Sequence, residues 1–383
     1  MSQYQIPPVQ PGDALPFYYG MTTDGLFFTL DEQAGRPAAV ILIGHDVSAD
    51  QIGMVESLMG DAVVLASRGA DILVFAVGDD LRALSPNAPD GIGVTFVGCD
   101  VAYLSSCGVE SGQIVVLIID RNRRVALHQI LVPGLNAVTA CLDSLDRLPT
   151  APPRDVFLPA PVLTLPNLLP APVCQYLIEQ FESRPTFDSA MASINADSSA
   201  GARIDHAKKA RRDLLISEEE PLYPLLQEAI LRRARPEIAR AFQANVTHVD
   251  RLLVARYDRT AGWFRRHRDN LAENVAFREF AISINLGADP FEGGDLRFPE
   301  YNDHRYRLTV GGALIFSASV LHEVTPIIRG ERTALLTFLH SDAAEARRQE
   351  YAGRIARAGM ANSNGGGAYM ANSQTVESTQ MAR

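Results

Sequence analysis

Three side chains in the second half of the sequence have the types and spacing of metal ligands. His267 and Asp269 are two positions apart, and His322 follows more than fifty residues later. Side chains two apart on a strand share a face, so the first two can point to one side and be joined there by a histidine from a distant strand. Two neutral imidazoles and one carboxylate leave the opposite side of a metal ion open. Such a set suits a ferrous ion that must still bind a co-substrate and O2, which a closed structural site would not allow.

An arginine follows at a position that suits anion binding. Arg332 lies ten positions after His322, behind a predicted turn over 329–331, and begins a predicted strand over 332–339. Its planar guanidinium can hold a carboxylate by two parallel hydrogen bonds. Because a buried arginine without a counter-charge is costly, we expect a bound anion beside the metal.

In this order and spacing, the residues resemble the Fe(II)/2-oxoglutarate-dependent dioxygenases, specifically their prolyl 4-hydroxylase-like branch. Besides the ligands, the resemblance rests on the run 257–267, on Glu-Gly-Gly-x-Leu-x-Phe-Pro at 292–299 and on Leu-His-Glu-Val-x-Pro at 321–326. It covers roughly residues 161–341. The expected domain is therefore a double-stranded β-helix, or jelly roll, with flanking helices.

The resemblance implies roles for five residues and three cofactors. His267, Asp269 and His322 would be the iron ligands and catalytic residues. Arg332 would bind the distal carboxylate of 2-oxoglutarate, and Tyr257 would hydrogen-bond the same co-substrate. Fe(II), 2-oxoglutarate and O2 are thus the expected cofactor, co-substrate and oxidant.

Two of these residues bear on the reaction that the resemblance implies. Many prolyl 4-hydroxylases carry lysine where this chain has Arg332. Related branches use arginine there, so the resemblance implies co-substrate binding but does not imply a proline substrate. Halogenases of the family have a small residue in place of Asp269, and chloride takes the vacated position, so the carboxylate favours hydroxylation. The expected reaction hydroxylates an unactivated C–H bond of an amino acid, a small metabolite or a peptidyl side chain, releasing succinate and CO2.

Two further arginines are candidates for substrate binding. Arg297 follows the glycine turn and can point into the mouth of the site, where it would meet a substrate carboxylate. Arg268 flanks the metal motif together with Arg265 and Arg266, and this group could meet an anionic substrate. Charged residues on the outside of strands near a site mouth are at least as common. The basic cluster at 208–212 is predicted to be solvated.

Other interpretations stay open at this stage. Each site residue taken alone has an ordinary structural explanation, such as a satisfied core histidine or a solvated strand arginine. The alternative of another class is a non-catalytic binding or scaffold protein whose enzyme-like domains are both degenerate. A third, a thiol peroxidase, requires a peroxide-sensitive cysteine.

Size, charge and cysteines limit the possibilities further. A chain of 383 residues is long enough for two domains. Its net charge of −10 is uneven, because residues 1–150 hold 17 acidic and 7 basic side chains while the remainder balances. Neither half has the basic character that nucleic-acid binding needs, so we expect no nucleic-acid partner. Without a membrane-length apolar run, a secretory signal or paired cysteine spacings, the protein is expected to be cytoplasmic and free of membranes.

Residues 1–150 are predicted to form an α/β domain in which apolar strands alternate with helices. The order resembles the thioredoxin-like fold of peroxiredoxin-like proteins, on the segment 11–16 and the apolar strand at 38–43. The following loop, 44–50, has no cysteine where the peroxidatic thiolate would sit, so no peroxide nucleophile is expected. Such a non-catalytic domain could mediate homodimerisation, present a partner or substrate, or simply stabilise the chain.

The remaining segments complete the predicted organisation. Residues 151–165 are a Pro-rich linker, and 166–345 form the dioxygenase domain. Within it, 186–210 is predicted to be a loop that covers the substrate or is disordered, and 305–310 a strand. Residues 346–383 should be helical and then disordered.

Overall fold

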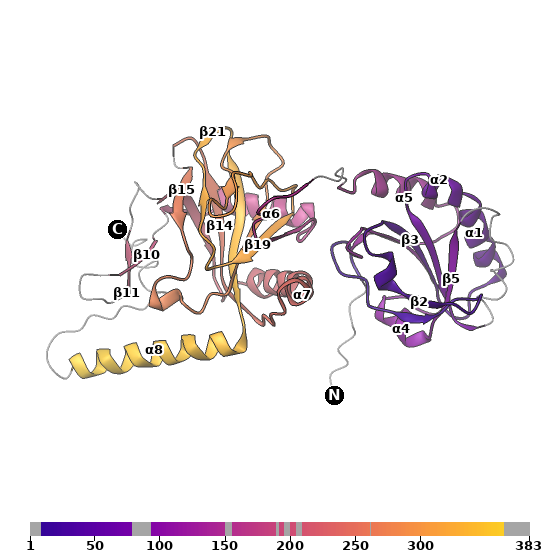
Figure 1. Cartoon of the computed structure of the whole chain (residues 1–383), viewed down its shortest axis with the longest axis horizontal. Coiled ribbons are helices and arrows are strands. Elements are labelled where there is room, and N and C mark those ends of the chain that lie inside the picture. Colours follow the sequence, from indigo (N-terminus) through magenta and orange to yellow (C-terminus); the bar gives the residue numbers. More distant parts are fainter. Residues whose placement is uncertain are drawn as a thin grey trace. The chain divides into compact units, whose positions relative to one another are not determined.

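The computed structural model describes residues 9–78, 93–149, 155–188, 191–194, 200–203, 209–260 and 262–363. The chain divides into two compact units, Met1–Val156 and Phe157–Arg383 (Figure 1). Within the described ranges, no helix combines the length and the apolarity that crossing a membrane would take.

The first unit is built on a five-stranded sheet with the order β5-β4-β3-β6-β7. The first three strands in this order are parallel, and the last two are antiparallel to their neighbours. The strands are β3 (Ala38–Ile43), β4 (Asp71–Ala76), β5 (Val94–Gly98), β6 (Ile114–Ile119) and β7 (Val125–Ile130). The hairpin β1 (Tyr19–Met21) and β2 (Phe27–Thr29) precedes them, and η1 (Leu30–Gln33) follows β2.

The central strand β3 is buried on both faces. Ala39 and Ile41 pack into a core with α1 (Ala49–Gly60), α2 (Ala62–Ala66) and α5 (Ala137–Asp146). On the other face, Val40 and Leu42 pack with α4 (Val101–Ser106). Burial on both faces explains why the strand reads as one continuous apolar run. The predicted α/β layer is present; α4 was not predicted, because it is a short helix that depends on its Asp100 cap.

The second unit consists of two facing sheets, consistent with the expected double-stranded β-helix. The larger sheet has the order β8-β19-β16-β22-β14-β13-β9, and the smaller one β12-β15-β20-β18. The larger sheet comprises β8 (Val162–Leu165), β9 (Phe187–Asp188), β13 (Arg212–Ile216), β14 (His248–Tyr257), β16 (Phe280–Asn285), β19 (Ala313–Ser317) and β22 (Arg332–His340). The smaller sheet comprises β12 (Lys209–Ala210), β15 (Trp263–His267), β18 (Leu296–Arg297) and β20 (His322–Val324). Two further pairs are β10 (Met191–Ile194) with β11 (Ala200–Arg203) and β17 (Glu292–Gly293) with β21 (Ile327–Arg329).

Alternate residues of the larger sheet serve different cores. On β14, Leu252 and Val254 face outward and pack with α6 (Ala171–Ser183) and α7 (Leu222–Phe242). Ala255 and Tyr257 face inward, toward the smaller sheet. The helices thus seal the outer face, and the inner face is left to line the interior. The last described element is α8 (Asp342–Ser363).

The structure corrects several details of the prediction. The described parts of 186–210 are not a plain loop, because they contribute β9, a hairpin of β10 and β11, and β12. The rest of that segment lies outside the described residues, as does the predicted disordered tail beyond residue 363. The predicted strand at 305–310 is reduced to a single bridge between Tyr306 and Leu296. β15 ends at His267, so Asp269 follows the strand instead of lying on it.

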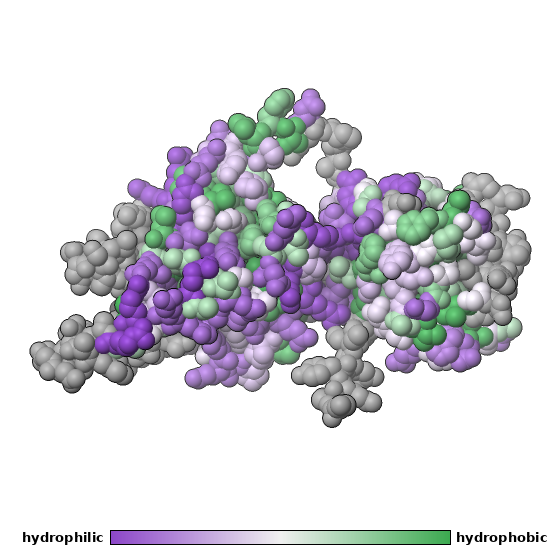
Figure 2. Space-filling view, turned by 60° about the horizontal axis from the view of Figure 1, so that its bottom comes forward, coloured by the Kyte–Doolittle hydropathy of each residue, from purple (hydrophilic) through white to green (hydrophobic). Residues whose placement is uncertain are grey.

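The two units differ in surface character on the face shown in Figure 2. Hydrophilic residues predominate over the second unit, whereas hydrophobic residues form several patches on the first. Exposed apolar side chains of the first unit include the β1–β2 region, where Tyr19 and Phe27 are among the more exposed.

Gly311 precedes β19 at a tightly packed position, so a substitution there tests the packing of the second unit. Its φ of +72° is in the left-handed region, and an added Cβ would lie 1.9 Å from the Leu169 carbonyl oxygen. We expect Gly311→Ala to lower the free energy of unfolding by roughly 2–4 kcal/mol. Urea unfolding can be followed through Trp263, the chain's single tryptophan, which lies in this unit.

Gly287→Ala is the matched control, because no atom lies within 4 Å of the position that an added Cβ would take and its φ is ordinary. It should change stability by no more than about 0.5 kcal/mol. Equal unfolding midpoints for the two variants would contradict the packing described for Gly311.

Candidate metal centre

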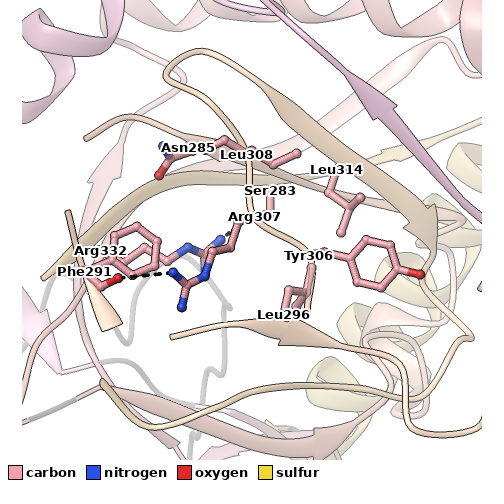
Figure 3. A pocket seen from close by; sticks show the side chains of 9 residues that line it. All are labelled: Ser283, Asn285, Phe291, Leu296, Tyr306, Arg307, Leu308, Leu314 and Arg332. Carbon is pink, nitrogen blue, oxygen red and sulfur yellow. Dashed lines mark hydrogen bonds between the residues drawn. The ribbon is translucent and has the colours of Figure 1, made fainter. Parts of the chain in front are cut away.

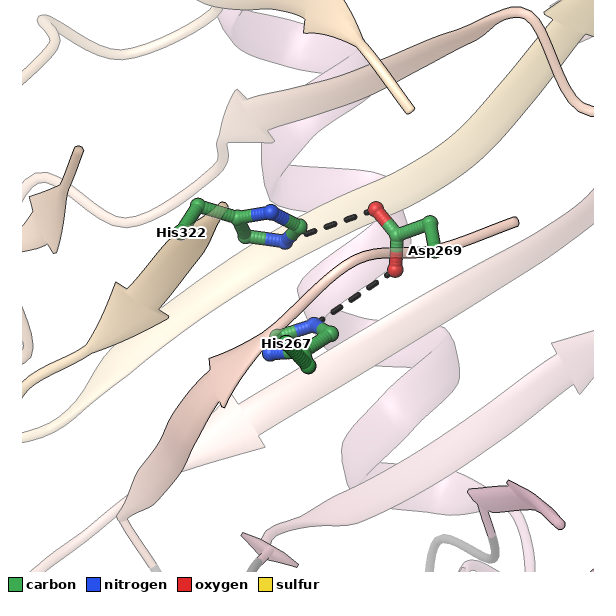
Figure 4. Close-up of side chains that lie close together, drawn as sticks. All are labelled: His267, Asp269 and His322. Carbon is green, nitrogen blue, oxygen red and sulfur yellow. Dashed lines mark ion pairs between the residues drawn. The ribbon is translucent and has the colours of Figure 1, made fainter. Parts of the chain in front are cut away.

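His267, Asp269 and His322 converge in the interior between the two sheets (Figure 4). One potential ligand atom from each lies within 4.8 Å of the others. The Asp269 carboxylate is 3.5 Å from Nε2 of His267 and 3.4 Å from Nε2 of His322. The two histidines meet because they are register partners on β15 and β20. Separate parts of the chain thus present three donors to one point, as the sequence predicts.

The hydrogen bonds of both imidazole rings engage Nδ1 and leave Nε2 available to bind a metal ion. Nδ1 of His322 lies 3.0 Å from the Val320 carbonyl oxygen, and Nδ1 of His267 lies 2.7 Å from that of Arg265. A carbonyl only accepts, so each Nδ1 carries the proton and each Nε2 keeps its lone pair. Burial lowers the pKa of His322 to about 4, which keeps that ring neutral at neutral pH.

Asp269 supplies the negative charge of the group. Burial alone would raise the pKa of its carboxyl, but the neighbouring His322 and His267 outweigh burial and hold that pKa low. The residue is fixed although it lies beyond the end of β15, because its backbone N–H donates to the Ala318 carbonyl at 2.9 Å. The donor set of two neutral imidazoles and one carboxylate therefore fits Fe(II).

Arg332 lies at the start of β22, buried beside Tyr257, its register partner on β14. Its Nη2 donates to Oγ of Ser283 at 2.8 Å, and its guanidinium lies 5.5 Å from the Tyr257 ring centroid. Burial lowers the pKa of this arginine. A smaller cavity adjoins Arg332 and is also lined by Ser283 and Tyr306 (Figure 3). Ser283 is buried and orients the guanidinium.

A buried charged network holds Tyr257 in place. Arg211 donates from Nη1 to the Tyr257 hydroxyl at 2.8 Å. The same arginine binds both carboxylate oxygens of Asp213, at 2.8 and 3.0 Å. Burial alone would lower the pKa of Arg211, but Asp213 and Tyr257 outweigh it, so the pKa is raised. The phenol oxygen accepts a hydrogen bond here, which leaves its own proton free to point elsewhere in the interior.

The triad, Arg332 and Tyr257 all line one cavity of about 730 Å³. That volume is within the range of small-molecule sites and leaves room for a co-substrate and a second molecule. The cavity brings together every residue that the sequence assigns to iron and 2-oxoglutarate.

The two predicted substrate residues are engaged with protein groups. Arg268 lines the cavity, but it donates to the Glu300 carboxylate and to the Ser319 carbonyl. Arg297 pairs with Asp303 and Glu323 and is not among the described residues that line the cavity. Both guanidinium groups therefore already have carboxylate partners in the protein.

Sequence reasoning missed four cationic residues of the cavity wall: Lys209, Arg211, Arg251 and Arg278. The first two belong to the cluster predicted to be solvated, yet they are 3% and 6% exposed. A signal was present, because Lys209, Arg211 and Asp213 alternate with apolar or outward residues over 209–213. That period of two, with an acid two positions after an arginine, is typical of an ion pair on one face of a strand.

Comparison with known proteins supports the chemistry suggested by this geometry. A PKHD-type hydroxylase of Burkholderia ambifaria is 28% identical over 158 residues, which cover 39% of this chain and 67% of the relative. A PKHD-type hydroxylase of Paraburkholderia xenovorans is 35% identical over 95 residues, covering 22% of this chain and 42% of the relative. The matches thus span only part of these relatives. No family profile matches the sequence.

Among solved structures, a Pseudomonas putida prolyl-4-hydroxylase aligns with a TM-score of 0.35 and 18% identity, covering 48% of this chain and 93% of the other. This likeness is too low to carry an argument by itself. The sequence similarity and the His-Asp-His group together support a 2-oxoglutarate-dependent iron hydroxylase, for which Fe(II), 2-oxoglutarate and O2 are required.

Metal binding can be tested without turnover. We expect His267→Ala and Asp269→Ala to remove stoichiometric binding of Mn²⁺, a redox-stable substitute for Fe²⁺, because each deletes one of three protein ligands. The loss should appear in calorimetric titration and as a missing rise of the melting temperature with metal. His304→Ala, which removes an exposed histidine, should bind Mn²⁺ as the unaltered chain does. Retained binding in Asp269→Ala would place the metal elsewhere.

Proposed function

We propose that the second unit is an Fe(II)/2-oxoglutarate-dependent dioxygenase that hydroxylates an unactivated C–H bond, releasing succinate and CO2. The observation that carries this proposal is the joint presence, in one cavity, of a three-donor metal group and a buried arginine. Either feature alone has ordinary explanations. Together they provide the two attachment points that a 2-oxo diacid needs, one at the metal and one at a guanidinium.

In this proposal, His267, Asp269 and His322 hold the iron from one side. The bound iron supplies the activation of O2 that no side chain of the chain can provide. The protein contributes ligand geometry, because the backbone carbonyls behind both imidazoles fix the rings. The apolar side chains Phe316 and Leu296 line the same cavity and limit the access of water.

Arg332 is the proposed anchor for the distal carboxylate of 2-oxoglutarate. Oγ of Ser283 accepts one hydrogen bond from Nη2 of Arg332. The other N–H groups of the guanidinium remain for an anion. Tyr257 is held by Arg211 with its hydroxyl proton available, so it can donate to the same carboxylate. A carboxylate bound to Arg332 would offset the free-energy cost of burying its charge.

The substrate remains one of the three classes suggested by the sequence: a free amino acid, another small metabolite or a peptidyl side chain. Asp269 fills the metal position that a halide would need, which supports hydroxylation over halogenation. The alternative of a non-catalytic scaffold is less well supported, since a degenerate site would have no reason to keep all three donors and Arg332 together.

We infer that the first unit is a thioredoxin-like domain without thiol chemistry. The sheet order and the helices on both faces support this interpretation. Of the four cysteines, Cys107, Cys141 and Cys174 are buried and Cys99 is partly buried. Burial raises the pKa of Cys99 to about 12 and that of Cys107 to about 11, so neither is a thiolate at neutral pH. Homodimerisation through this unit and a cytoplasmic location stay predictions.

Co-substrate binding gives a direct test of Arg332. We expect Arg332→Gln to weaken 2-oxoglutarate binding to the Mn²⁺-loaded chain by about 10- to 100-fold, the cost of losing charge-assisted hydrogen bonds. Mn²⁺ affinity should stay unchanged. Arg329→Gln, three positions earlier and exposed, is the matched control and should bind 2-oxoglutarate normally. If Arg332→Gln binds 2-oxoglutarate as tightly as the control, the co-substrate is anchored by another group.

The thiols give a second test. In the native chain, all four cysteines should react with a thiol reagent far more slowly than after unfolding in urea, because they are protonated and wholly or partly buried. Treatment with hydrogen peroxide should leave them unmodified by mass spectrometry. A native cysteine that forms a sulfenic acid within seconds would restore the peroxidase interpretation.

A further inference from the structure

The cavity contains many more cations than the proposed reaction uses. Eight basic and two acidic side chains line it. The basic ones are Lys209, Arg211, Arg251, Arg265, Arg266, Arg268, Arg278 and Arg332, and the acidic ones are Asp269 and Glu323. An excess of one sign in a cleft with low-dielectric walls attracts ligands of the opposite sign.

Four of these eight cations pair with an identified protein carboxylate. Arg211 is bound to Asp213, and Arg278 donates to Asp250 at 2.7 Å. Arg266 and Arg268 pair with Glu323 and Glu300 nearer the exterior. These pairs compensate their own charge, and Arg251 is not among them.

Arg251 differs from the others in its hydrogen bonding. Its Nε is buried and has no hydrogen-bond partner among the described residues. Its guanidinium lies 5.9 Å from the Phe338 ring centroid, in the wall of the cavity. Buried polar groups are nearly always satisfied, so an unsatisfied donor in a side chain that lines a cavity points to a missing acceptor.

The backbone at Arg251 is also unusual. Its φ is +36°, a conformation that a residue with a long side chain rarely adopts. It lies in the irregularity between Asp250 and Leu253, where β14 has one residue more than its partner β22. Bulges next to sites redirect side chains, and strained residues of this kind cluster at ligand sites. The strain is independent of the unsatisfied donor and points to the same residue.

Lys209 brings a second positive charge to the cavity wall. It is 3% exposed, and its Nζ lies 4.9 Å from the Phe264 ring centroid. Burial, together with the nearby Arg211 and Arg251, holds the pKa of Lys209 well below its usual value. Burial and Arg278 likewise lower the pKa of Arg251 to about 10. Asp213 offsets part of both penalties, and a bound anion would offset more.

Part of the cavity wall is apolar. Leu253, Val275, Leu336 and Phe338 line it, beside the metal group. Apolar surface of this kind favours a hydrocarbon body, and the positive excess disfavours any ligand that carries an ammonium group. The cavity therefore suits a molecule with an anionic head and an aliphatic body.

We propose that Arg251 and Lys209 form a second anion site, which holds the carboxylate of an aliphatic organic acid while its hydrocarbon body extends toward the iron. This inference rests on the proposed function and names the substrate class for the same cavity. A carboxylate is assigned because the planar fork of arginine matches its two oxygens.

The new site is separate from the co-substrate site. Arg332 and Phe338 are at opposite ends of the inner face of β22, and six residues of strand span about 20 Å. Arg332 adjoins Tyr257 at one end, and Arg251 adjoins Phe338 at the other. One small diacid cannot occupy both arginines, so the two anions belong to two molecules.

The test is calorimetric titration of the full chain, loaded with Mn²⁺ and saturated with 2-oxoglutarate, with octanoate, octanamide and octyl phosphate. Octanoate should bind, and octanamide, which lacks the charge, should bind at least 10-fold more weakly. Arg251→Gln should weaken octanoate binding by about 10- to 100-fold. It should leave octanamide and 2-oxoglutarate binding unchanged. Lys209→Gln should act in the same direction, so it keeps the test available if Arg251→Gln does not fold.

Arg265→Gln is the matched control, because Arg265 lines the same cavity but is exposed at its mouth. It should change octanoate affinity less than 2-fold. Equal losses in Arg251→Gln and Arg265→Gln would mean that general positive potential, not a site, attracts the acid, and would overturn the proposal. So would equal binding of octanoate and octanamide, or tighter binding of octyl phosphate.

The same titrations separate this inference from the proposed function. If the unaltered chain binds no 2-oxoglutarate, the dioxygenase proposal fails whatever octanoate does. If 2-oxoglutarate binds normally and octanoate binding does not depend on Arg251, only the second anion site fails. If Arg251→Gln weakens 2-oxoglutarate instead, the anchor assigned to Arg332 has been misplaced and the inference fails with it.

Discussion

The free-energy cost of burying positive charge is the constraint that shapes the second unit. A buried guanidinium is costly unless an anion meets it, and several of them line one cavity here. Arg211 pairs with the carboxylate of Asp213, and Arg278 pairs with that of Asp250. Arg332 donates to a neutral hydroxyl instead, and the buried Nε of Arg251 has no acceptor among the described residues. Those two guanidinium groups are the ones that we propose bind ligands.

The fold accommodates these charges because helices cover the outer face of the larger sheet, while its inner face lines the cavity. Leu252 and Val254 of β14 pack under α6 and α7, so the strand is anchored from outside. The alternate residues, Tyr257 and Leu253, are then free to line the interior. Stability and chemistry use opposite faces of the same strand, and a slip of one residue would exchange them.

The sequence was sufficient to predict that His267, Asp269, His322 and Arg332 lie in one site, because their types, order and spacing are all visible in one chain. It could not reveal that Asp269 follows β15, since that depends on a backbone hydrogen bond to Ala318. The burial of Lys209 and Arg211 was predicted wrongly for a similar reason. A cluster of basic residues normally faces water, and only the pairing of β12 with β15 and of β13 with β14 turns these side chains inward.

The strained backbone at Arg251 could not have been predicted at all, because it arises from a register shift between two strands far apart in sequence. That shift has a chemical consequence. A carboxylate fixed at Arg251 would place successive carbons of an aliphatic chain at set distances along the inner face, and the metal group lies beside only a few of them. The position of hydroxylation would then be counted from the acid group, so that regiochemistry would follow from the placement of one bulge relative to three ligands.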